Sequence, residues 1–375
     1  MANPIPSRLL PDNTSIDENG SGSIAGCDLV ELAQEYGTPL FVYDENHLRA
    51  RCREAVKAFG EGVAYAGKAF LCGAMSRLVV EEGMNIDVAT GGELYMALHA
   101  GIDGSRLIMH GNNKSESELR MALEAGVSRI VVDSFDELDR LQILHKETGI
   151  SPKILLRITP GVEAHTHEFI STGQDDSKFG FTVSTGMALE AVERAVKTEA
   201  VELVGIHAHI GSQVFKVDSF IRAVEVMAEF SNPLELPELS IGGGLGVSYL
   251  EDDHAPSITE WGEAVQTACI QTGIKAKVTA EPGRAIAAAA AVTLYRIGTI
   301  KELEGLRTYV AVDGGMSDNP RPVLYGSGYE TFLPRSMDKK RDRSIRMVGK
   351  HCESGDLLVR EGWIPSDVAI GDVIA

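Results

Sequence analysis

Short apolar runs alternate with amphipathic patterns through the first three quarters of the chain. Apolar runs of about four to eight residues, bounded by glycine or polar residues, are typical of buried parallel strands. We expect eight such strands, at residues 63–66, 85–89, 106–110, 129–133, 153–159, 203–210, 238–242 and 277–281. Between them apolar residues recur at helical spacing, which predicts helices at residues 69–82, 93–100, 115–124, 135–146, 188–197, 218–229 and 258–271. This alternation predicts an α/β fold of the (β/α)8 barrel type.

The pattern changes after residue 284. Short strand-like runs follow at residues 292–297, 308–312, 344–348 and 357–359, and long helical patterns end. We therefore expect a barrel at residues 41–284 and a smaller C-terminal β domain at residues 285–375. Residues 1–40 are expected to form a mobile polar arm over 1–22, then a helix, then a strand-like segment that packs on the β domain. The rival fold is a doubly wound sheet, which would need an early glycine-rich nucleotide turn that this sequence lacks.

Composition narrows the classes of partner. The 375 residues carry a formal net charge of −19 at pH 7, which argues against nucleic acid or an anionic membrane as the main partner. The five cysteines are odd in number and lack paired metal-site spacing, so we expect free thiols in a cytoplasmic protein and no metal site. Residues 1–22 lack the apolar core of a signal peptide, and the apolar run at residues 285–292 is too short to span a membrane.

Lys68 directly follows the first predicted strand. The carboxyl ends of the strands are where barrel enzymes hold their chemistry. Apolar neighbours disfavour the charged ammonium, so we expect a lowered pKa for Lys68 and an amine that can act as a nucleophile. We therefore interpret Lys68 as a residue that forms a Schiff base. The alternative is a strand-end lysine that extends into solvent.

Further polar groups and glycines lie near, at or just beyond the ends of the other predicted strands. They are Asp87, His209, Ser212, Gly243, Gly244, Glu281 and Arg284. Each has a simpler explanation: Asp87 could cap a helix, His209 could be an interior histidine, and the glycine run could be a tight turn. Their convergence on one rim of the barrel favours a binding site instead.

One part of this rim suits a phosphate. The backbone N–H groups of Gly243 and Gly244, with the positive end of a following helix, would bind the anion. Ser212 can add a hydroxyl and Arg284 a guanidinium.

The remaining groups suit a pyridine aldehyde. Lys68 would hold the aldehyde, Glu281 is the candidate carboxylate that keeps the pyridine nitrogen protonated, and His209 is expected to stack on the ring. These are the requirements of pyridoxal 5'-phosphate (PLP).

Five short motifs occur in order along the chain: YAGKA at residues 65–69, DVATGGE at 87–93, HAHIGSQ at 207–213, EPGR at 281–284 and CESGD at 352–356. They resemble the motifs of the diaminopimelate decarboxylases, and the resemblance extends from about residue 25 to the end of the sequence. It implies a PLP enzyme of fold type III, with a barrel and a β domain, that works as a homodimer with active sites shared across the interface. It also implies a carbon–carbon lyase that converts meso-2,6-diaminopimelate into L-lysine and CO2, the last step of lysine biosynthesis. The expected cofactor site comprises Lys68, Asp87, His209, Ser212, Gly243, Gly244, Glu281 and Arg284.

A second set of residues would recognise the substrate. Arg321 and Tyr325 follow the second strand of the β domain, and a guanidinium fork suits a distal carboxylate. In the family that these motifs resemble, the matching pair contacts this carboxylate together with the residue that corresponds to Arg284. Glu353 resembles the acid that binds the distal ammonium from the partner subunit, and Cys352 resembles the thiol that supplies the proton replacing CO2. The alternatives are a loop-holding surface arginine and a buried small cysteine.

The resemblance leaves two matters open. Family members continue beyond the position of Ala375 through a tyrosine-containing strand, so we expect a truncated β domain and weaker PLP binding. Rival functions are a racemase or carrier on the same barrel, an inactive regulatory homologue, and a Schiff-base aldolase. Cys352, Glu353 and Arg321 argue against a racemase or carrier. Retention of Lys68, Glu281 and Cys352 argues against an inactive homologue, whereas the missing C-terminal segment argues for one. A Schiff-base aldolase needs no acid at a ring nitrogen, which makes it the weakest alternative.

Overall fold

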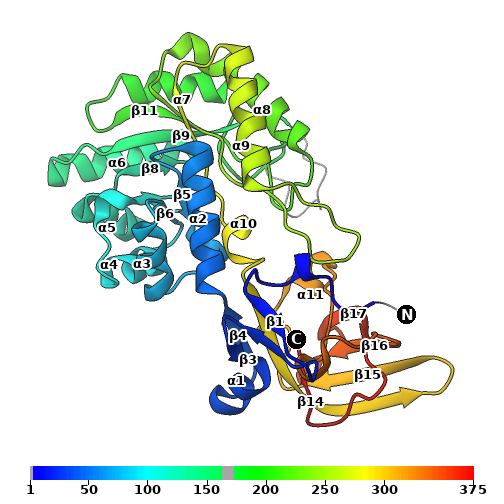
Figure 1. The fold of residues 1–375 in the computed structure, drawn as a ribbon. Coiled ribbons are helices and arrows are strands. Elements are labelled where there is room, and N and C mark those ends of the chain that lie inside the picture. The colour runs from blue at the N-terminus through cyan, green and yellow to red at the C-terminus, as the bar shows by residue number, and fades with distance from the viewer. Residues whose placement is uncertain (1–2, 163–172) are drawn as a thin grey trace. The chain divides into compact units, whose positions relative to one another are not determined.

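A computed structural model describes residues 3–162 and 173–375. The chain divides into two units, which are described separately (Figure 1). The barrel unit comprises Arg49–Val247 and Ala255–Ala287, and the β unit comprises Met1–Leu48, Ser248–His254 and Ala288–Ala375.

Parallel strands in chain order form the wall of the barrel unit. They are β5 (Ala64–Ala66), β6 (Asn85–Val88), β7 (Leu107–Met109), β8 (Arg129–Val132), β9 (Lys153–Thr159), β11 (Glu202–His207), β12 (Glu238–Ser240) and β13 (Lys277–Thr279). The ring closes where Ala64 and Ala66 of β5 donate backbone hydrogen bonds to Ala280 and Pro282, at 3.0 and 3.2 Å. A short strand, β10 (Phe181–Thr182), pairs in parallel with β9. The predicted (β/α)8 barrel is confirmed.

Helices follow the strands and cover the outside of the barrel (Figure 1). They are α2 (Glu45–Phe59), α3 (Gly73–Glu81), α4 (Gly91–His99), α5 (Glu116–Ala125), α6 (Phe135–Thr148), α7 (Met187–Val196), α8 (Val217–Ser231), α9 (Ile258–Thr272) and α10 (Arg284–Ala287), with short 3-10 turns η2 (Gly67–Ala69), η3 (Gly104–Arg106) and η5 (Asn232–Leu234). Ser115 and Ser257 form capping boxes that fix where α5 and α9 begin. Trp261 of α9 is fully buried against Phe59 and Phe220, with ring centroids 4.6 and 5.2 Å away, and joins three helices.

The β unit is built on one long strand. This strand, β14 (Ala291–Leu303), pairs antiparallel with β4, β15 and β18. The unit's elements are β1 (Thr14–Ile16), β2 (Gly22–Ile24), β3 (Cys27–Asp28), β4 (Leu40–Tyr43), β15 (Arg307–Val312), β16 (Arg343–Val348), β17 (Leu357–Ile364), β18 (Val373–Ile374), α1 (Leu29–Tyr36), α11 (Arg321–Tyr325), η1 (Ser7–Leu9) and η6 (Pro334–Ser336). Strands β1, β2 and β3 form a separate small sheet.

Three sequence-based expectations need correction. Residues 1–22 were predicted to be a mobile arm, but their described part contributes strand residues and buries Ile5 and Leu10 in a hydrophobic cluster of the β unit. The helix predicted at residues 69–82 begins only at Gly73, because Phe70 and Cys72 have extended backbones and Cys72 caps the helix. Ser248–His254 was placed in the barrel, whereas it belongs to the β unit, where Arg341 pairs with Glu251. Among the described residues, no helix is long and apolar enough to cross a membrane.

Candidate functional site

The structure places the predicted reactive lysine at the carboxyl end of the first barrel strand. Lys68 lies in η2, directly after β5. Burial lowers the pKa of Lys68, and the positive charge of Arg157 lowers it further, against the opposing effect of Glu281 and Asp87. The side chain keeps access to solvent although protein groups surround its amine, so water reduces the size of this shift without changing its direction. Lys68 therefore has a larger fraction of neutral, nucleophilic amine than an ordinary lysine at the same pH.

Two buried carboxylates face the same region and differ in ionisation. Burial and the negative charge of Glu281 raise the pKa of Asp87 well above its ordinary value. Burial also acts to raise the pKa of Glu281, but the charges of His207 and His110 and the hydrogen bonds from His207 and Ser240 outweigh it and lower the pKa. We conclude that Glu281 favours the ionised form and that Asp87 retains its proton to higher pH than an ordinary aspartate.

Asp87 does not cap the next helix. Thr90 is the N-cap of α4 and accepts a hydrogen bond from the Glu93 backbone, while Glu93 accepts one from the Ala89 backbone at 2.6 Å. The helix start therefore satisfies its own donors. Asp87 instead lies in the barrel wall opposite Ala66 of β5, the residue that stands two positions before Lys68.

His209 is held as a neutral imidazole. Burial and the positive charges of Lys68 and Arg157 keep the pKa of His209 well below its ordinary value. Its Nδ1 accepts a hydrogen bond from the Gly243 backbone at 3.2 Å. The ring is thus fixed in one tautomer, with its proton on Nε2.

The glycine run is required by close backbone contacts. A Cβ on Gly243 would lie 2.2 Å from the Glu281 carbonyl oxygen, and one on Gly244 would lie 2.3 Å from the Gly211 carbonyl oxygen. The helix that follows the run along the chain, α9, begins at Ile258, as predicted. Directly after the glycines the chain runs beside the loop that follows β11, where Val214 and Leu245 form a bridge.

The Ser212 hydroxyl and the Arg284 guanidinium, both predicted to bind the phosphate, lie within hydrogen-bonding distance of each other. Arg284, the first residue of α10, donates from Nη2 to Ser212 Oγ at 3.0 Å. Two groups from the ends of different strands are thereby brought together beside the glycine run.

Four residues of this region were not predicted. Strand register places Arg157, His207 and Ser240 side by side on β9, β11 and β12, and His110 directly follows β7. Arg157 is buried, with its guanidinium 3.6 Å from Asp133 and 4.2 Å from the Phe179 ring centroid. The sequence signal that could have identified these four residues is that each is a polar residue near the end of an apolar run.

His110 lies between the two carboxylates. Its Nε2 is 3.4 Å from Asp87 Oδ1 and 3.8 Å from Glu281 Oε1. Burial lowers the pKa of His110 to about 3, so the ring is neutral. His110, His207 and Glu281 could also present one atom each to a divalent cation, since these atoms lie within 4.8 Å of one another; no metal site was predicted from the sequence.

The predicted substrate-binding arginine lies in the β unit and is held in a fixed orientation. Arg321 begins α11, and its Nε and Nη2 donate to Tyr329 Oη and Ser327 Oγ, both at 3.2 Å. Its guanidinium carbon lies 5.3 and 5.9 Å from the ring centroids of Tyr325 and Tyr249. The predicted pair of Arg321 and Tyr325 is therefore in contact, and further guanidinium N–H groups remain for a ligand.

Cys352 and Glu353 lie on the exposed loop between β16 and β17 of the β unit. Asp356 holds this loop by accepting hydrogen bonds from the backbones of Met316 and His351, at 2.6 and 2.9 Å. The expected alternative of a buried cysteine is wrong for Cys352 within this chain.

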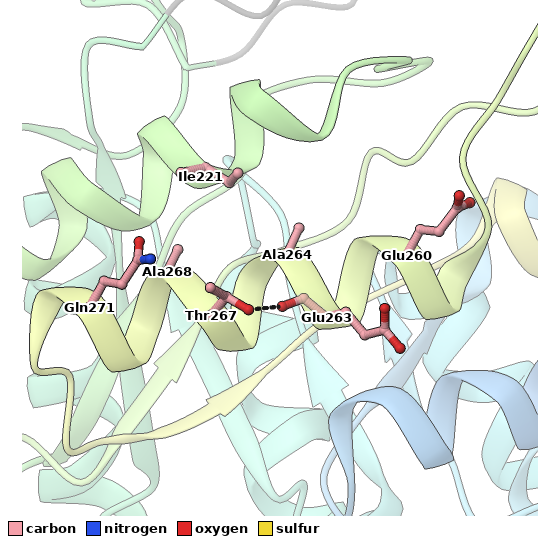
Figure 2. A pocket seen from close by; sticks show the side chains of 7 residues that line it. All are labelled: Ile221, Glu260, Glu263, Ala264, Thr267, Ala268 and Gln271. Carbon is pink, nitrogen blue, oxygen red and sulfur yellow. Dashed lines mark hydrogen bonds between the residues drawn. The ribbon is translucent and has the colours of Figure 1, made fainter.

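A shallow groove on the outside of the barrel offers no comparable chemistry. Figure 2 shows it over α8 and α9, lined by Ile221, Glu260, Glu263, Ala264, Thr267, Ala268 and Gln271. The Thr267 hydroxyl donates to the Glu263 carbonyl of the same helix. None of the predicted site residues lines this groove.

Comparison with known proteins agrees with this geometry. Residues 45–288 match the family model of the pyridoxal-dependent decarboxylases, pyridoxal binding domain. A diaminopimelate decarboxylase of Mycobacterium tuberculosis is 48% identical over 97% of this chain and 86% of its own length. The chain belongs to the diaminopimelate decarboxylase family. The family member of Bacillus subtilis is 44% identical over 96% of this chain and 85% of its own length.

Solved structures of the family share the fold of this chain. The diaminopimelate decarboxylase of M. jannaschii has a TM-score of 0.87 and 32% identity, covering 97% of this chain and 86% of its own. The enzyme of Helicobacter pylori, in complex with L-lysine, has a TM-score of 0.83 and 30% identity, covering 92% and 86%.

The donor set of the barrel rim fits the family's cofactor. Glu281 is an anion that can accept a hydrogen bond from a protonated pyridine nitrogen, Lys68 offers an amine of lowered pKa, and Ser212 and Arg284 suit a phosphate. Asp87 Oδ1 and His110 Nε2 are buried and make no hydrogen bond to the described part of the protein. Polar atoms left in this way are expected where a polar ligand binds.

Proposed function

We propose that this protein is a PLP-dependent decarboxylase that converts meso-2,6-diaminopimelate into L-lysine and CO2. The observation that carries the proposal is the similarity, at 43–48% identity over nearly the whole chain, to curated diaminopimelate decarboxylases. The donor set of the barrel rim supports it from the chemistry side. When bound, PLP supplies the electron sink that accepts the electron pair left as CO2 departs.

The barrel unit would hold the cofactor. Lys68 binds its aldehyde carbon through Nζ, and the lowered pKa of Lys68 favours the neutral amine that this requires. Glu281 accepts a hydrogen bond from the ring nitrogen, and neutral His209 contacts the ring. Ser212, Arg284 and the glycines bind the phosphate region.

The β unit would supply residues that bind the distal end of the substrate. Arg321 and Tyr325 bind the distal carboxylate, and Glu353 binds the distal ammonium. A substrate without the second carboxylate would leave the Arg321 guanidinium without its partner, and sites built to pair a polar group of the substrate can discriminate by about 10⁴–10⁵-fold. Cys352 Sγ would supply the proton that replaces CO2.

A homodimer with shared sites in the cytoplasm completes the proposal. The exposure of Cys352 and Glu353 within one chain supports their action in a site completed by a partner subunit. Mixing inactive Lys68→Ala and Cys352→Ala proteins tests this, because a mixed dimer would regain one intact site. Activity that stays absent in mixtures that form mixed dimers would contradict the shared site.

The reaction itself is tested by measuring CO2 and L-lysine from meso-2,6-diaminopimelate, with chromatography that separates L-lysine from D-amino acids. We expect both products from the native chain and neither from Lys68→Ala. Lys146→Ala, on the exposed face of α6, is the matched control and should keep full activity. Formation of a D-amino acid without CO2 would instead identify a racemase.

A further inference from the structure

Both oxygens of the buried Glu281 carboxylate have hydrogen-bonding partners within the barrel. Ser240 Oγ donates to Oε1 at 2.6 Å, and His207 Nε2 lies 2.9 Å from Oε2. His207 and Ser240 are the last residues of β11 and β12 and are direct partners in the strand register. Two neighbouring strand ends therefore direct polar groups at one carboxylate.

The direction of these hydrogen bonds is set by their surroundings. The Gly242 backbone donates to Ser240 Oγ at 3.2 Å, so the hydroxyl proton of Ser240 remains available for Glu281. Because Glu281 is the ionised member of the carboxylate pair, His207 Nε2 carries the proton that it shares with Oε2. An ionised carboxylate has no proton to donate, so Glu281 can only accept hydrogen bonds. Any further group that binds to it must therefore be a hydrogen-bond donor.

Other titratable groups surround this arrangement. His110 approaches Glu281 Oε1 at 3.8 Å from β7. Asp87 from β6, Lys68 from η2 and Arg157 from β9 act on it electrostatically. None of these four is hydrogen-bonded to Glu281 among the interactions of the described residues, whereas Ser240 and His207 are.

We propose that Ser240 and His207 are positioning residues that fix Glu281 as an anion, so that it can pair with the ring nitrogen of the cofactor only when that nitrogen is protonated. The inference deepens the proposed function and rests on it. Ser240 and His207 act through Glu281 and need not touch cofactor or substrate. The protonation of the ring nitrogen, and with it the strength of the electron sink, depends on these two donors.

The variants that test this are Ser240→Ala and His207→Phe, which remove one donor each. His207→Gln keeps an N–H at a similar reach and is the conservative rescue. Ser128→Ala is the matched control, because its hydroxyl donates to the Leu107 carbonyl at 2.7 Å, at the amino-terminal end of β8.

The direct readout is the ¹⁵N NMR signal of the bound cofactor, labelled at its ring nitrogen, followed against pH in the loaded protein. In the native protein and in Ser128→Ala we expect a protonated nitrogen across the neutral range. In Ser240→Ala and His207→Phe we expect the protonated signal to be lost at lower pH, and kcat/KM to fall by about 10- to 100-fold, since hydrogen bonds to charged groups contribute factors of this order. His207→Gln should recover most of both.

The experiment distinguishes a failure of this inference from a failure of the proposed function. If the native protein takes up no PLP, both fail. If it binds PLP with a protonated ring nitrogen and Ser240→Ala keeps the same pH profile and kcat/KM within about twofold, the inference alone is overturned. Ser240→Ala removes a single oxygen and decides the matter even if His207→Phe does not fold.

Discussion

Replacing Arg321 with lysine keeps the positive charge but removes the planar fork. In the structure two of the five guanidinium N–H groups already bond to Tyr329 and Ser327, which orients the remaining edge. That edge can offer two parallel hydrogen bonds to a carboxylate, whereas an ammonium held at the same place offers one well-directed bond. One lost charge-assisted bond is worth about 1.5–3 kcal/mol, or roughly 10- to 100-fold in affinity.

We therefore expect Arg321→Lys to raise KM for meso-2,6-diaminopimelate by about 10- to 100-fold with kcat changed much less, because the distal carboxylate is held equally before and during the reaction. L-Lysine retains that carboxylate, so its inhibition constant should rise by a similar factor.

Steady-state kinetics with substrate and with L-lysine as inhibitor measure both quantities. Arg346→Lys is the control, because Arg346 binds a backbone carbonyl on β17. A large fall in kcat with unchanged KM and unchanged L-lysine inhibition would refute the assignment of Arg321 to the distal carboxylate.

Three further predictions concern stability and reactivity. Lys114→Met should lower the unfolding free energy by about 3–5 kcal/mol in urea titrations, because it leaves the buried Glu137 carboxylate, 2.7 Å from Lys114 Nζ, without its charged partner. Adding Glu137→Gln should recover part of this loss. If the effects of the two substitutions were fully additive, the pairing would be contradicted. The raised pKa of Asp87 gives stability that is present below its ordinary value near 3.8 and is lost as pH rises through the folded-state pKa. The stability gained by Asp87→Asn should therefore grow as pH rises above that ordinary value, and a gain independent of pH would contradict the raised pKa. Iodoacetamide at pH 8 should modify the exposed Cys352 and abolish activity. It should spare Cys52, because burial raises the pKa of that thiol to about 12. Peptide mapping that found Cys52 modified first would disprove this.

The barrel was predictable because its strands are apolar on both faces and its helices on one. Strand β9 has the predicted bounds, and the other barrel strands differ by a few residues at their ends. The β unit was harder to predict. Strand β14 continues to Leu303, six residues beyond the predicted end, because its last residues are mostly exposed and give no apolar signal. The polar first 22 residues likewise conceal Ile5 and Leu10, whose burial depends on distant partners.

Most of the predicted site residues follow a strand, with Asp87 in β6 as the exception, and the missed residues lie within strands except His110, which follows β7. Lys68 and Glu281 stand beyond the ends of apolar runs, so their chemistry was visible in the sequence. Arg157, His207 and Ser240 belong to the strands themselves, and only the register between strands shows that they lie side by side. The helix after the glycines was predicted at residues 258–271, and α9 spans Ile258–Thr272, because its apolar residues recur at helical spacing.

The proposed chemistry depends on a covalent link between the cofactor and the amine at the end of β5. Reduction of the loaded protein with borohydride, followed by digestion and mass spectrometry, locates that link directly. We predict a pyridoxyl group on Lys68 and on no other lysine. A pyridoxyl group on a different lysine, or on none, would contradict the central claim.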